Sequence, residues 1–358
     1  MEEKKFWICA NLSGLGPARL KKLLKIAGSI DKVFQLSEIE LREASVPKNV
    51  VAKILKWEEL PWQDEIRFCR QQNVKILTRE DADYPYLLKQ IYAPPFMLYV
   101  KGKIPKTEQT IAIIGTRNPS LYGRRMAEKF AIELAYLGFT IISGLARGID
   151  TAAHKGALKG AGKTVGVLGS GFNNFYPRDN FKLAERILDN NGAIITEFNF
   201  SARPEPSHFP IRNRIVSGLS KGVLVIEAGQ RSGALITANC ALDQGREIFA
   251  LPGQVDNIFS KGVNYLLKEG ALLVENTQDI LDSLNLELKI PKKTKKITHK
   301  GLTKTENKIL ATIGNKKMHI EELLSVSELK HREVSDSLLS LLIKGLIVEL
   351  PGKIYSKK

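Results

Sequence analysis

Cysteine is scarce in this sequence, and long apolar segments are missing. Only 3 cysteines occur among the 358 residues, and they form no Cys-x-x-Cys pair, so neither a disulfide framework nor a structural zinc site is expected. No stretch approaches the ~20 consecutive apolar residues that span a bilayer. The first residues also lack the apolar core of a secretory signal peptide. We therefore expect a cytoplasmic protein without a membrane span.

Positive charge is abundant. The 54 lysines and arginines exceed the 38 aspartates and glutamates and give a formal net charge of +16. Such an excess attracts nucleic acids or anionic membrane surfaces, although it can also be only a solvated surface. With 43% hydrophobic and 26% charged residues, the composition is that of a globular protein. At about 150 residues per domain, the length predicts two to three domains.

The N-terminal part, residues 1–75, reads as short helices without a strong strand. Within it, residues 12–24 contain two glycines in a tight turn and Pro17 at the start of the next helix, which is typical of a helix–hairpin–helix. Such a turn either offers backbone N–H groups to a phosphate or merely packs a small helical domain. Residues 76–109 look like an extended connector with a short strand at 96–100.

Residues 110–288 alternate between apolar β-rich runs and amphipathic helical segments. The apolar runs are residues 111–115, 140–143, 164–169, 193–196, 223–227, 247–251 and 271–274. Continuous apolar strands separated by helices indicate βαβ units and a parallel sheet that is covered on both faces. The fold class predicted for this part is α/β, with a Rossmann-like parallel sheet as the core.

The C-terminal part begins with a basic, non-periodic run at 289–301, which reads as a linker. Residues 302–358 then predict three helices followed by a β-hairpin. That order is typical of a winged helix-turn-helix. The segment expected as the recognition helix, residues 331–344, mixes basic with acidic side chains. Duplex binding and a scaffold or partner-binding role therefore both remain open for this domain.

Two motifs that suggest a nucleotide cofactor do not fit their context. Residues 157–164 loosely match a phosphate-binding P-loop, but a helix at 149–159 precedes them and a strand follows, which is the reverse of the arrangement a P-loop needs. The loop at 115–120 is not Gly-x-Gly-x-x-Gly, and no acidic residue ends the second strand to hold a ribose. We therefore expect no cofactor.

The loops that follow five of the strands share small residues, arginines and aromatic rings. In parallel sheets such loops emerge at one edge. Small residues offer backbone N–H groups, arginines bind phosphates and rings stack on bases, a mixture that suits a single-stranded nucleic acid. The candidate residues are Gly115, Thr116, Arg117, Ser143, Gly144, Arg147, Gly169, Ser170, Gly171, Tyr176, Arg178, Phe181, Arg212, Asn213, Arg214, Ser232 and Gly233.

No catalytic set is visible at these loops. There is no Cys–His pair, no Gly-x-Ser-x-Gly elbow and no metal-binding cluster. His154 and His208 are the only histidines near the strand ends. Asp150 and Glu197 could act as acid or base, but an aspartate at a helix start more often caps the helix, and we expect Asp150 to do so. The prediction is a binding protein and not an enzyme, with no catalytic or metal site.

Taken in order, these motifs resemble the bacterial DNA-processing protein A (DprA/Smf) family. The matching residues are Gly115 to Arg117, Ser143 to Asp150, Ala153-His154, Gly169 to Gly171, Tyr176-Pro177, Phe209 to Arg214, Ser232 to Thr237 and Leu251 to Gly253. The resemblance implies a sterile-alpha-motif-like N-terminal helical domain and a C-terminal winged helix around the Rossmann-like core.

The same resemblance implies a function and partners. Members of the family bind single-stranded DNA during natural transformation and load the recombinase RecA onto it. They form homodimers through the Rossmann-like domain, and we expect residues 246–275 to form that interface here. By motif position, Arg117, Arg178 and Phe181 are the expected contacts with the strand. Gly144, Arg147 and Arg212 are expected neighbours.

Two other functions remain alternatives to this one. Related Rossmann-like enzymes hydrolyse the glycosidic bond of nucleoside monophosphates, using a glutamate soon after a Gly-rich loop. Here the loop at 232–237 is followed by Ala238, Asn239 and Cys240, which disfavours hydrolysis. The weaker alternative is a transcription regulator that uses the winged helix and has the Rossmann-like domain as its sensor.

Overall fold

The structure is a computed structural model that describes residues 2–286, 302–314, 316–343, 346–350 and 352–357. It contains two compact units, Met1–Lys289 and Ile290–Lys358, and each is considered by itself. The basic run predicted as a linker, residues 289–301, lies outside the described residues. Among the described helices, none is long and apolar enough to cross a membrane.

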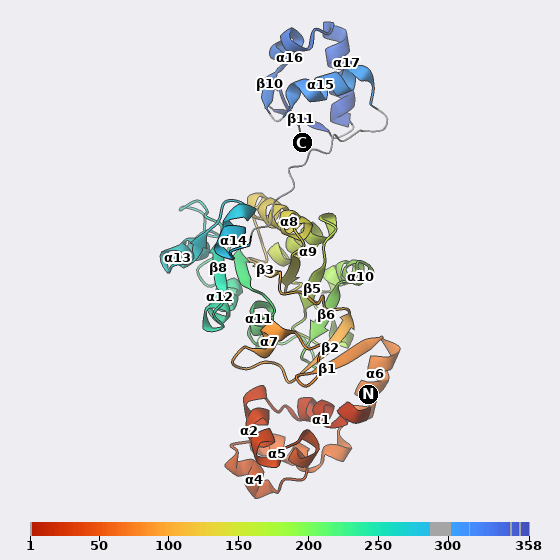
Figure 1. Ribbon diagram of the computed structural model, residues 1–358, viewed down its shortest axis with the longest axis vertical. Helices are drawn as coiled ribbons and strands as arrows, with labels where there is room; N and C mark the ends of the chain where they lie inside the picture. Colours follow the sequence, from red (N-terminus) through yellow and green to blue (C-terminus); the bar gives the residue numbers. More distant parts are fainter. Residues whose placement is uncertain (1, 287–301, 315, 344–345, 351, 358) are drawn as a thin grey trace. The chain divides into compact units, whose positions relative to one another are not determined.

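A nine-stranded sheet organises the first unit (Figure 1). Its order is β1-β2-β6-β5-β4-β3-β7-β8-β9, and every pair from β6 to β9 is parallel. The strands are β1 Val74–Thr78, β2 Met97–Gly102, β3 Thr110–Ile114, β4 Thr140–Ser143, β5 Thr164–Val167, β6 Ala193–Thr196, β7 Gly222–Val225, β8 Glu247–Ala250 and β9 Leu272–Leu273. The predicted α/β class is confirmed.

The chain reverses its direction of growth at β3. It moves outward from β3 through β4, β5 and β6, and then returns to place β7 on the other side of β3. Ala112 of β3 accordingly pairs with Ile142 of β4 on one side and with Val223 of β7 on the other. In open α/β sheets, ligands bind beyond the carboxyl ends of the strands at such a switch point. The sheet order therefore points to the edge beyond β3 and β7.

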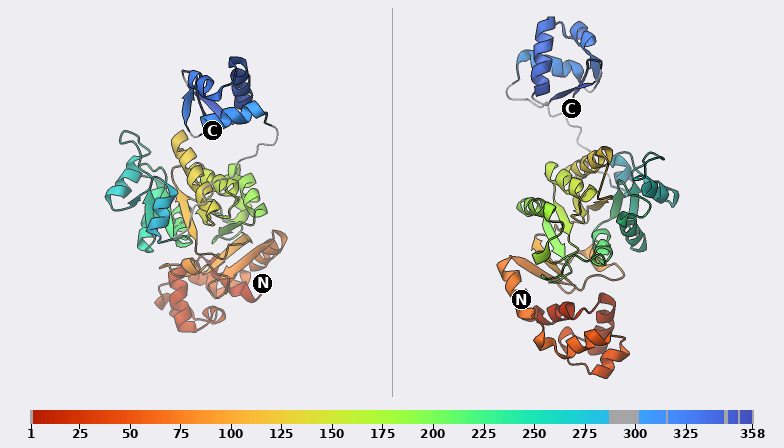
Figure 2. Two further views of the ribbon diagram at one scale, coloured as in Figure 1. Left: turned by 45° about the horizontal axis from the view of Figure 1, so that its top comes forward. Right: turned by 180° about the vertical axis from the view of Figure 1, so that it is seen from behind.

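Helices cover both faces of the sheet because consecutive strand residues point to opposite faces. Ile111 and Ile113 pack against α8, α9 and α14, whereas Ala112 and Ile114 pack in the core with α11, α12 and α13. Figure 2 shows these layers from two further sides. The helices are α8 Leu121–Tyr136, α9 Ile149–Lys159, α10 Phe181–Asp189, α11 His208–Gly218, α12 Gly233–Asp243, α13 Lys261–Lys268 and α14 Thr277–Ser283.

The N-terminal residues form a layer of short helices. They are α1 Lys5–Ser13, α2 Pro17–Ala27, α3 Ile30–Val33, α4 Glu38–Glu43, α5 Lys48–Leu55 and α6 Trp62–Gln71. The predicted helical hairpin is present: α1 ends at Gly14, whose φ is +83°, and Pro17 is the first residue of α2. A positive φ favours glycine, which explains the first glycine of the turn.

The segment expected as a connector joins this layer to the sheet. After α7 (Tyr86–Lys89), strand β2 pairs antiparallel with β6, and β1 pairs antiparallel with β2. Val74, Ile76 and Tyr99 of these strands share one buried core with Trp7 and Leu20 of the helical layer. Lys4 also forms a 2.5 Å ion pair with Asp81. The helical layer is therefore packed onto the antiparallel extension of the sheet.

The second unit is a winged helix. It comprises α15 Lys304–Ile313, β10 Lys317–His319, α16 Ile320–Ser327, α17 His331–Ile343, β11 Ile347–Leu350 and β12 Ile354–Lys357. Thr303 caps α15 in a reciprocal capping box with Glu306. The predicted hairpin is present, and β10 adds a third strand on the far side of β12, which periodicity did not predict because it has only three residues.

Candidate nucleic-acid interface

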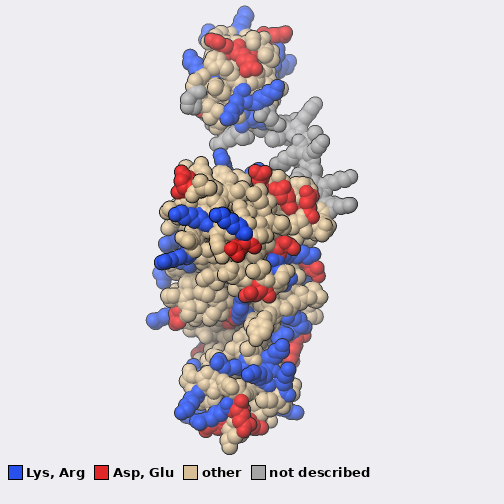
Figure 3. Space-filling model, turned by 90° about the vertical axis from the view of Figure 1, so that its left-hand side faces the viewer, with Lys and Arg blue, Asp and Glu red and all other residues tan. Residues whose placement is uncertain are grey.

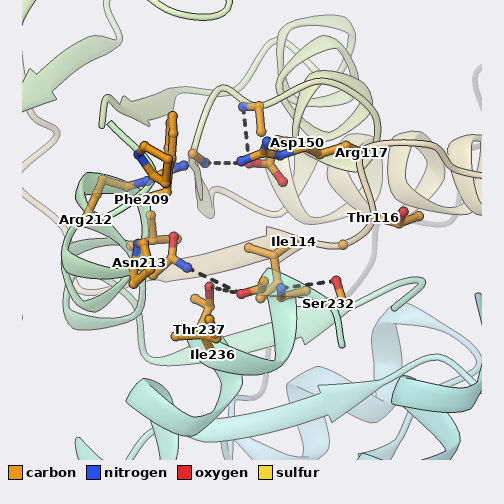
Figure 4. A pocket seen from close by; sticks show the side chains of 18 of the residues that line it. Ile114, Thr116, Arg117, Asp150, Phe209, Arg212, Asn213, Ser232, Ile236 and Thr237 are labelled. Atoms are coloured by element: carbon orange, nitrogen blue, oxygen red, sulfur yellow. Dashed lines mark hydrogen bonds between the residues drawn. The ribbon is translucent and has the colours of Figure 1, made fainter. Parts of the chain in front are cut away.

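A pocket of about 710 Å³ lies beyond the carboxyl ends of β3 and β7, at the switch point of the sheet. Figure 4 shows Arg117, Asp150, Phe209 and Arg212 on one side of this sheet-edge pocket. On the other side are Ile236 and Thr237 of α12 and Ser232, which precedes this helix. Of the residues predicted from the sequence, those that line it are Gly115, Thr116, Arg117, Gly144, Tyr176, Arg212, Asn213, Ser232 and Gly233.

A smaller hollow of about 170 Å³ continues from it. This side pocket shares Arg117, Gly144 and Arg212 with the sheet-edge pocket and adds Arg147 and Gly169, both also predicted from the sequence. The loops after β3, β4 and β5 therefore converge as expected for parallel strands.

Arg117 is exposed and lies on the loop after β3. Its guanidinium carbon is 5.2 Å from the centre of the Phe209 ring, a distance suited to a cation–π interaction. Gly169 lies beneath that ring, because a Cβ there would be 2.8 Å from Phe209 Cδ1. The ring therefore holds Arg117 at the mouth of the pocket, while its charge remains accessible to a ligand.

Arg212 supplies a second positive charge from the buried side of the pocket. It is 5% exposed, and its Nη1 donates a 3.0 Å hydrogen bond to the carbonyl oxygen of Val167. Burial lowers the pKa of Arg212 to about 10, the nearby Asp150 carboxylate opposes this change, and Arg117 adds to it. Arg212 therefore remains protonated at neutral pH. A buried cation that borders a pocket attracts an anion more strongly than a solvated one does.

Asp150 holds the loop after β4, and the prediction that it caps a helix is wrong. The cap of α9 is Gly148, which has a φ of +83° and whose Cβ would lie 2.4 Å from the carbonyl oxygen of Thr116. The Asp150 carboxylate instead accepts hydrogen bonds from the backbone N–H groups of Gly144 (3.0 Å) and Ala146 (3.3 Å). Burial raises the pKa of Asp150, while Arg212 and these N–H groups lower it.

The start of α12 forms the opposite wall. Ser232 caps this helix, its Oγ accepting a 3.2 Å hydrogen bond from the N–H of Ala234. A Cβ on Gly233 would meet nothing within 4 Å, so the backbone there faces open space. Helix N-termini carry partial positive charge and bind phosphates through their free N–H groups. This wall therefore adds to the attraction for anions exerted by the two arginines.

Arg178 and Phe181 lie outside both pockets, on the surface beside the side pocket. Arg178 begins the short 3-10 helix Arg178–Asn180, and Phe181 is the first residue of α10. Phe181 is 51% exposed. Its ring and that of Phe175 form an edge-to-face pair with their centres 5.4 Å apart. Asp179, between them, accepts a 2.8 Å hydrogen bond from Arg147 of the side pocket. Both residues are thus near the pockets and accessible to solvent.

Four further predicted residues lie away from the two pockets. The Ser143 hydroxyl donates to the carbonyl oxygen of Ile113 at 2.7 Å, and Ser170 is fully buried. A Cβ on Gly171 would lie 2.1 Å from the carbonyl oxygen of Asn199. Arg214 pairs with Glu197 and also donates to the carbonyl oxygen of Ala93. None of the four lines either pocket.

Sequence reasoning missed two residues that shape the site. Phe209 lies within a motif that was singled out, but only the structure shows its ring under Arg117. Glu227 follows β7 and accepts hydrogen bonds from the backbone N–H (2.9 Å) and the hydroxyl of Ser120. This contact fixes the loop after β3, which carries Arg117. An acidic residue two positions after a buried strand was the available signal.

The titratable groups at the site are engaged in structural contacts. His154 is buried, its Nδ1 lies 2.7 Å from Thr164 Oγ1, and burial together with the charge of Arg212 lowers its pKa to about 3. The carboxylates of Asp150, Glu197 and Glu227 all accept hydrogen bonds. Within the described ranges no cluster of metal-binding side chains occurs.

Two family models match this chain. The model of the family DNA recombination-mediator protein A matches residues 75–285, and that of the DprA winged helix domain matches residues 294–353. Protein Smf of Escherichia coli is 35% identical over 336 residues, which cover 92% of this chain and 90% of that protein. DNA processing protein DprA of Streptococcus pneumoniae is 37% identical over 275 residues, covering 75% and 94%.

Solved structures agree with the sequence relatives. The X-ray structure of DNA processing protein A from Streptococcus pneumoniae is similar with a TM-score of 0.66 and 33% identity, covering 78% of this chain and 97% of that one. DNA processing protein A from Helicobacter pylori, reported with structural insights into its unique single-stranded DNA binding mode, gives a TM-score of 0.54 and 31% identity, covering 60% and 97%. This chain therefore belongs to the DNA recombination-mediator protein A family, whose members include DprA and Smf.

Proposed function

We propose that this protein binds single-stranded DNA in the sheet-edge pocket and across the adjoining side pocket. Two arginines and a helix N-terminus attract phosphates there. Tyr176 is 38% and Phe181 51% exposed, so both rings are free to stack on bases. Stacking and phosphate contacts tolerate any sequence. The single-stranded DNA binding mode reported for the Helicobacter pylori relative supports the same ligand for this chain.

The observation that carries the proposal is that Arg117 and Arg212 line the same pocket, one at its surface and the other in its interior. Arg117 is exposed at the mouth and Arg212 is buried beneath it. A loop arginine alone is a common surface feature. Asp150 and the carbonyl oxygen of Val167 only partly offset the burial of Arg212, whose pKa is lowered to about 10, so an anion in the pocket stabilises this charge further.

Binding of oligothymidylate in a salt series tests this function. Each phosphate contact adds about −0.7 to the slope of log affinity against log salt concentration for single strands. We expect a clear negative slope for the wild-type protein and a slope shallower by about 0.7 for Arg117→Ala. Exposed Lys53 on α5 lines neither pocket, and Lys53→Gln is the control. Binding without a salt slope, or equal binding by both variants, contradicts the proposal.

The partners belong to the same proposal. We expect the bound strand to be handed to the recombinase RecA during natural transformation or recombination in the cytoplasm, with no chemical turnover. A RecA strand-exchange assay on DNA coated with single-strand-binding protein tests this step. Stimulation that is lost in Arg117→Ala is expected.

A homodimer through residues 246–275 remains part of the proposal. Exposed apolar side chains support it, because Val255, Ile258 and Tyr265 are each more than half exposed, and so is Leu273 in the edge strand β9. Clustered exposed apolar residues mark protein interfaces. Sedimentation of wild type and Tyr265→Arg tests it: a dimer that becomes a monomer supports this surface, and an unchanged mass contradicts it.

A further inference from the structure

A second basic hollow lies away from the sheet edge, between the helical layer and the antiparallel strands. This lysine groove has a volume of about 420 Å³. It is lined by Trp7, Pro17, Leu20, Lys21, Leu24, Lys25, Arg79, Glu80, Lys89, Pro94 and Phe96. Its residues come from α1, α2, the turn after β1, α7 and the approach to β2.

The groove has an unbalanced positive charge. Lys21, Lys25, Arg79 and Lys89 line it against a single acid, Glu80. None of these four cations takes part in an ion pair among the described residues. The Nε atom of Arg79 is buried and has no hydrogen-bond partner in the described part of the chain. A buried donor without a partner is unusual in a folded protein, so the Nε atom of Arg79 leaves part of this positive charge without an acceptor in this part of the protein.

The groove has a helical wall and an aromatic base. One wall is a face of α2, because its lining residues recur at helical spacing: Pro17, Leu20, Lys21, Leu24 and Lys25. The rings of Trp7 and Phe96 stack at 6.1 Å beneath it and are 5% and 7% exposed. These rings are too buried to stack on a base. The groove therefore suits the charged, repetitive sugar–phosphate backbone better than the bases.

A short stretch of structure links the groove to the sheet-edge pocket. Asn213 of α11 lines the sheet-edge pocket, and the next residue, Arg214, donates to the carbonyl oxygen of Ala93. The residue after Ala93 is Pro94, which lines the groove. Figure 3 shows basic side chains gathered over the N-terminal helical layer on the face it presents. A chain of phosphates that leaves the first pocket thus has a second cationic surface within the same compact unit.

We propose that the lysine groove is a second binding station for the phosphate backbone of the same DNA strand. The inference rests on the proposed function, since it extends the strand from the sheet-edge pocket. Strands that are long enough reach both stations, whereas short ones occupy the pocket alone.

Binding of two oligothymidylates, one of about 5 and one of about 20 nucleotides, tests the proposal. The variant removes two charges from the groove, Lys21→Gln with Lys25→Gln. The control removes two exposed charges elsewhere, Lys22→Gln with Lys53→Gln; Lys22 lies on α2 but does not line the groove. Thermal unfolding of both variants verifies the fold, and since all four lysines are exposed, neither should lose it.

For the long strand, the groove variant should bind on the order of 10-fold more weakly than the control, with a salt slope shallower by about 1.4. For the short strand, the two variants should bind alike. Lys89→Gln, from the other wall, should lower the long-strand slope by a further ~0.7. The proposal is overturned if the groove variant and the control bind the long strand equally well. It is also overturned if an acidic peptide binds the groove while the salt slope for the long strand is the same in the variant and the control.

Failure of this inference can be told apart from failure of the proposed function. If Arg117→Ala weakens the short strand while the groove variant matches its control on the long one, the pocket binds DNA and the groove does not. If Arg117→Ala leaves the short strand unaffected, the proposed function itself fails.

Discussion

The sheet-edge pocket and the lysine groove are both basic, but their charges are held in different ways. In the pocket, Arg212 is 5% exposed and hydrogen-bonded to a backbone carbonyl oxygen, and Gly144 makes room for it. In the groove, Lys21, Lys25 and Lys89 are exposed on flexible side chains. A buried, fixed charge positions a ligand, whereas solvated charges attract it over a distance and are screened by salt. The pocket should therefore be sensitive to shape, and the groove to ionic strength.

The largest effect should come from a side chain at Gly144. A Cβ there would lie 1.5 Å from Arg212 Nη1, and the buried arginine has little room to move. Gly144→Val should displace Arg212 from the Val167 carbonyl and cost about 2–4 kcal/mol of folding free energy. Denaturant unfolding measures this, and binding of the short strand should be lost as well.

Gly233→Ala is the matched control. Its Cβ would meet nothing within 4 Å, and alanine favours a helix over glycine, so stability should be kept or slightly raised. A Gly144→Val protein as stable as Gly233→Ala would show that the pocket tolerates changes of shape and would remove the contrast with the groove.

The second effect concerns acid. His154 lies behind the pocket with its pKa lowered to about 3, against an ordinary value of about 6.5 in the unfolded chain. Between these values the unfolded chain binds a proton that the folded one does not, so stability is complete above about pH 6.5 and falls as pH decreases toward 3. The loss should reach a few kcal/mol.

Urea unfolding at about pH 7 and pH 4.5 measures this dependence. His154→Gln removes the titrating group and should flatten the difference between the two pH values, even if the variant is less stable overall. Asp150, whose pKa is raised, acts in the opposite sense and stabilises the fold as pH falls. An undiminished pH dependence in His154→Gln would assign the acid sensitivity to other groups.

The third effect concerns the aromatic rings, which are exposed beside the pocket and buried in the groove. Phe181 is 51% exposed beside the pocket, whereas Trp7 and Phe96 are buried in the groove. Phe181→Ala should weaken binding of both the short and the long strand by roughly 1–3 kcal/mol if a base stacks there. Phe181→Tyr keeps the ring and should bind like wild type. Equal losses in the two variants would exclude stacking at this position.

Sequence patterns captured the central sheet because its strands are buried on both faces. β3, β4, β5, β6 and β7 are buried throughout, and such apolar runs stand out between helices. β1 alternates between buried and exposed residues, which favours a strand, but it was missed because it is only five residues long. Its five residues also follow directly on the helical segment, so nothing in composition marks the change.

The sequence predicts a residue of the site when the position of its loop determines whether it lines the pocket. It does not predict one when the direction of its side chain determines this. Gly115, Arg117 and Gly144 follow strands that must end at one edge, so their convergence follows from topology. Arg214 lies two residues beyond Arg212 on α11, but points to Glu197, and spacing alone does not reveal that. The lysine groove has no motif because Lys21, Arg79 and Lys89 meet only after the helical layer packs on β1 and β2.

The smallest effect should come from Arg147, which combines features of both regions. It lines the side pocket, but its side chain is 59% exposed and pairs with Asp179, which is 65% exposed. An exposed pair contributes at most about 1 kcal/mol to stability, so Arg147→Ala should leave denaturant unfolding nearly unchanged. If Arg147 contacts a phosphate, the salt slope for the short strand should still become shallower by about 0.7.

Asp179→Asn should have the opposite effect on binding, because it frees Arg147 and should tighten binding slightly at low salt. Equal slopes in wild type, Arg147→Ala and Asp179→Asn would confine the cationic part of the interface to Arg117 and Arg212, and the strand would then leave the pocket without crossing toward α10.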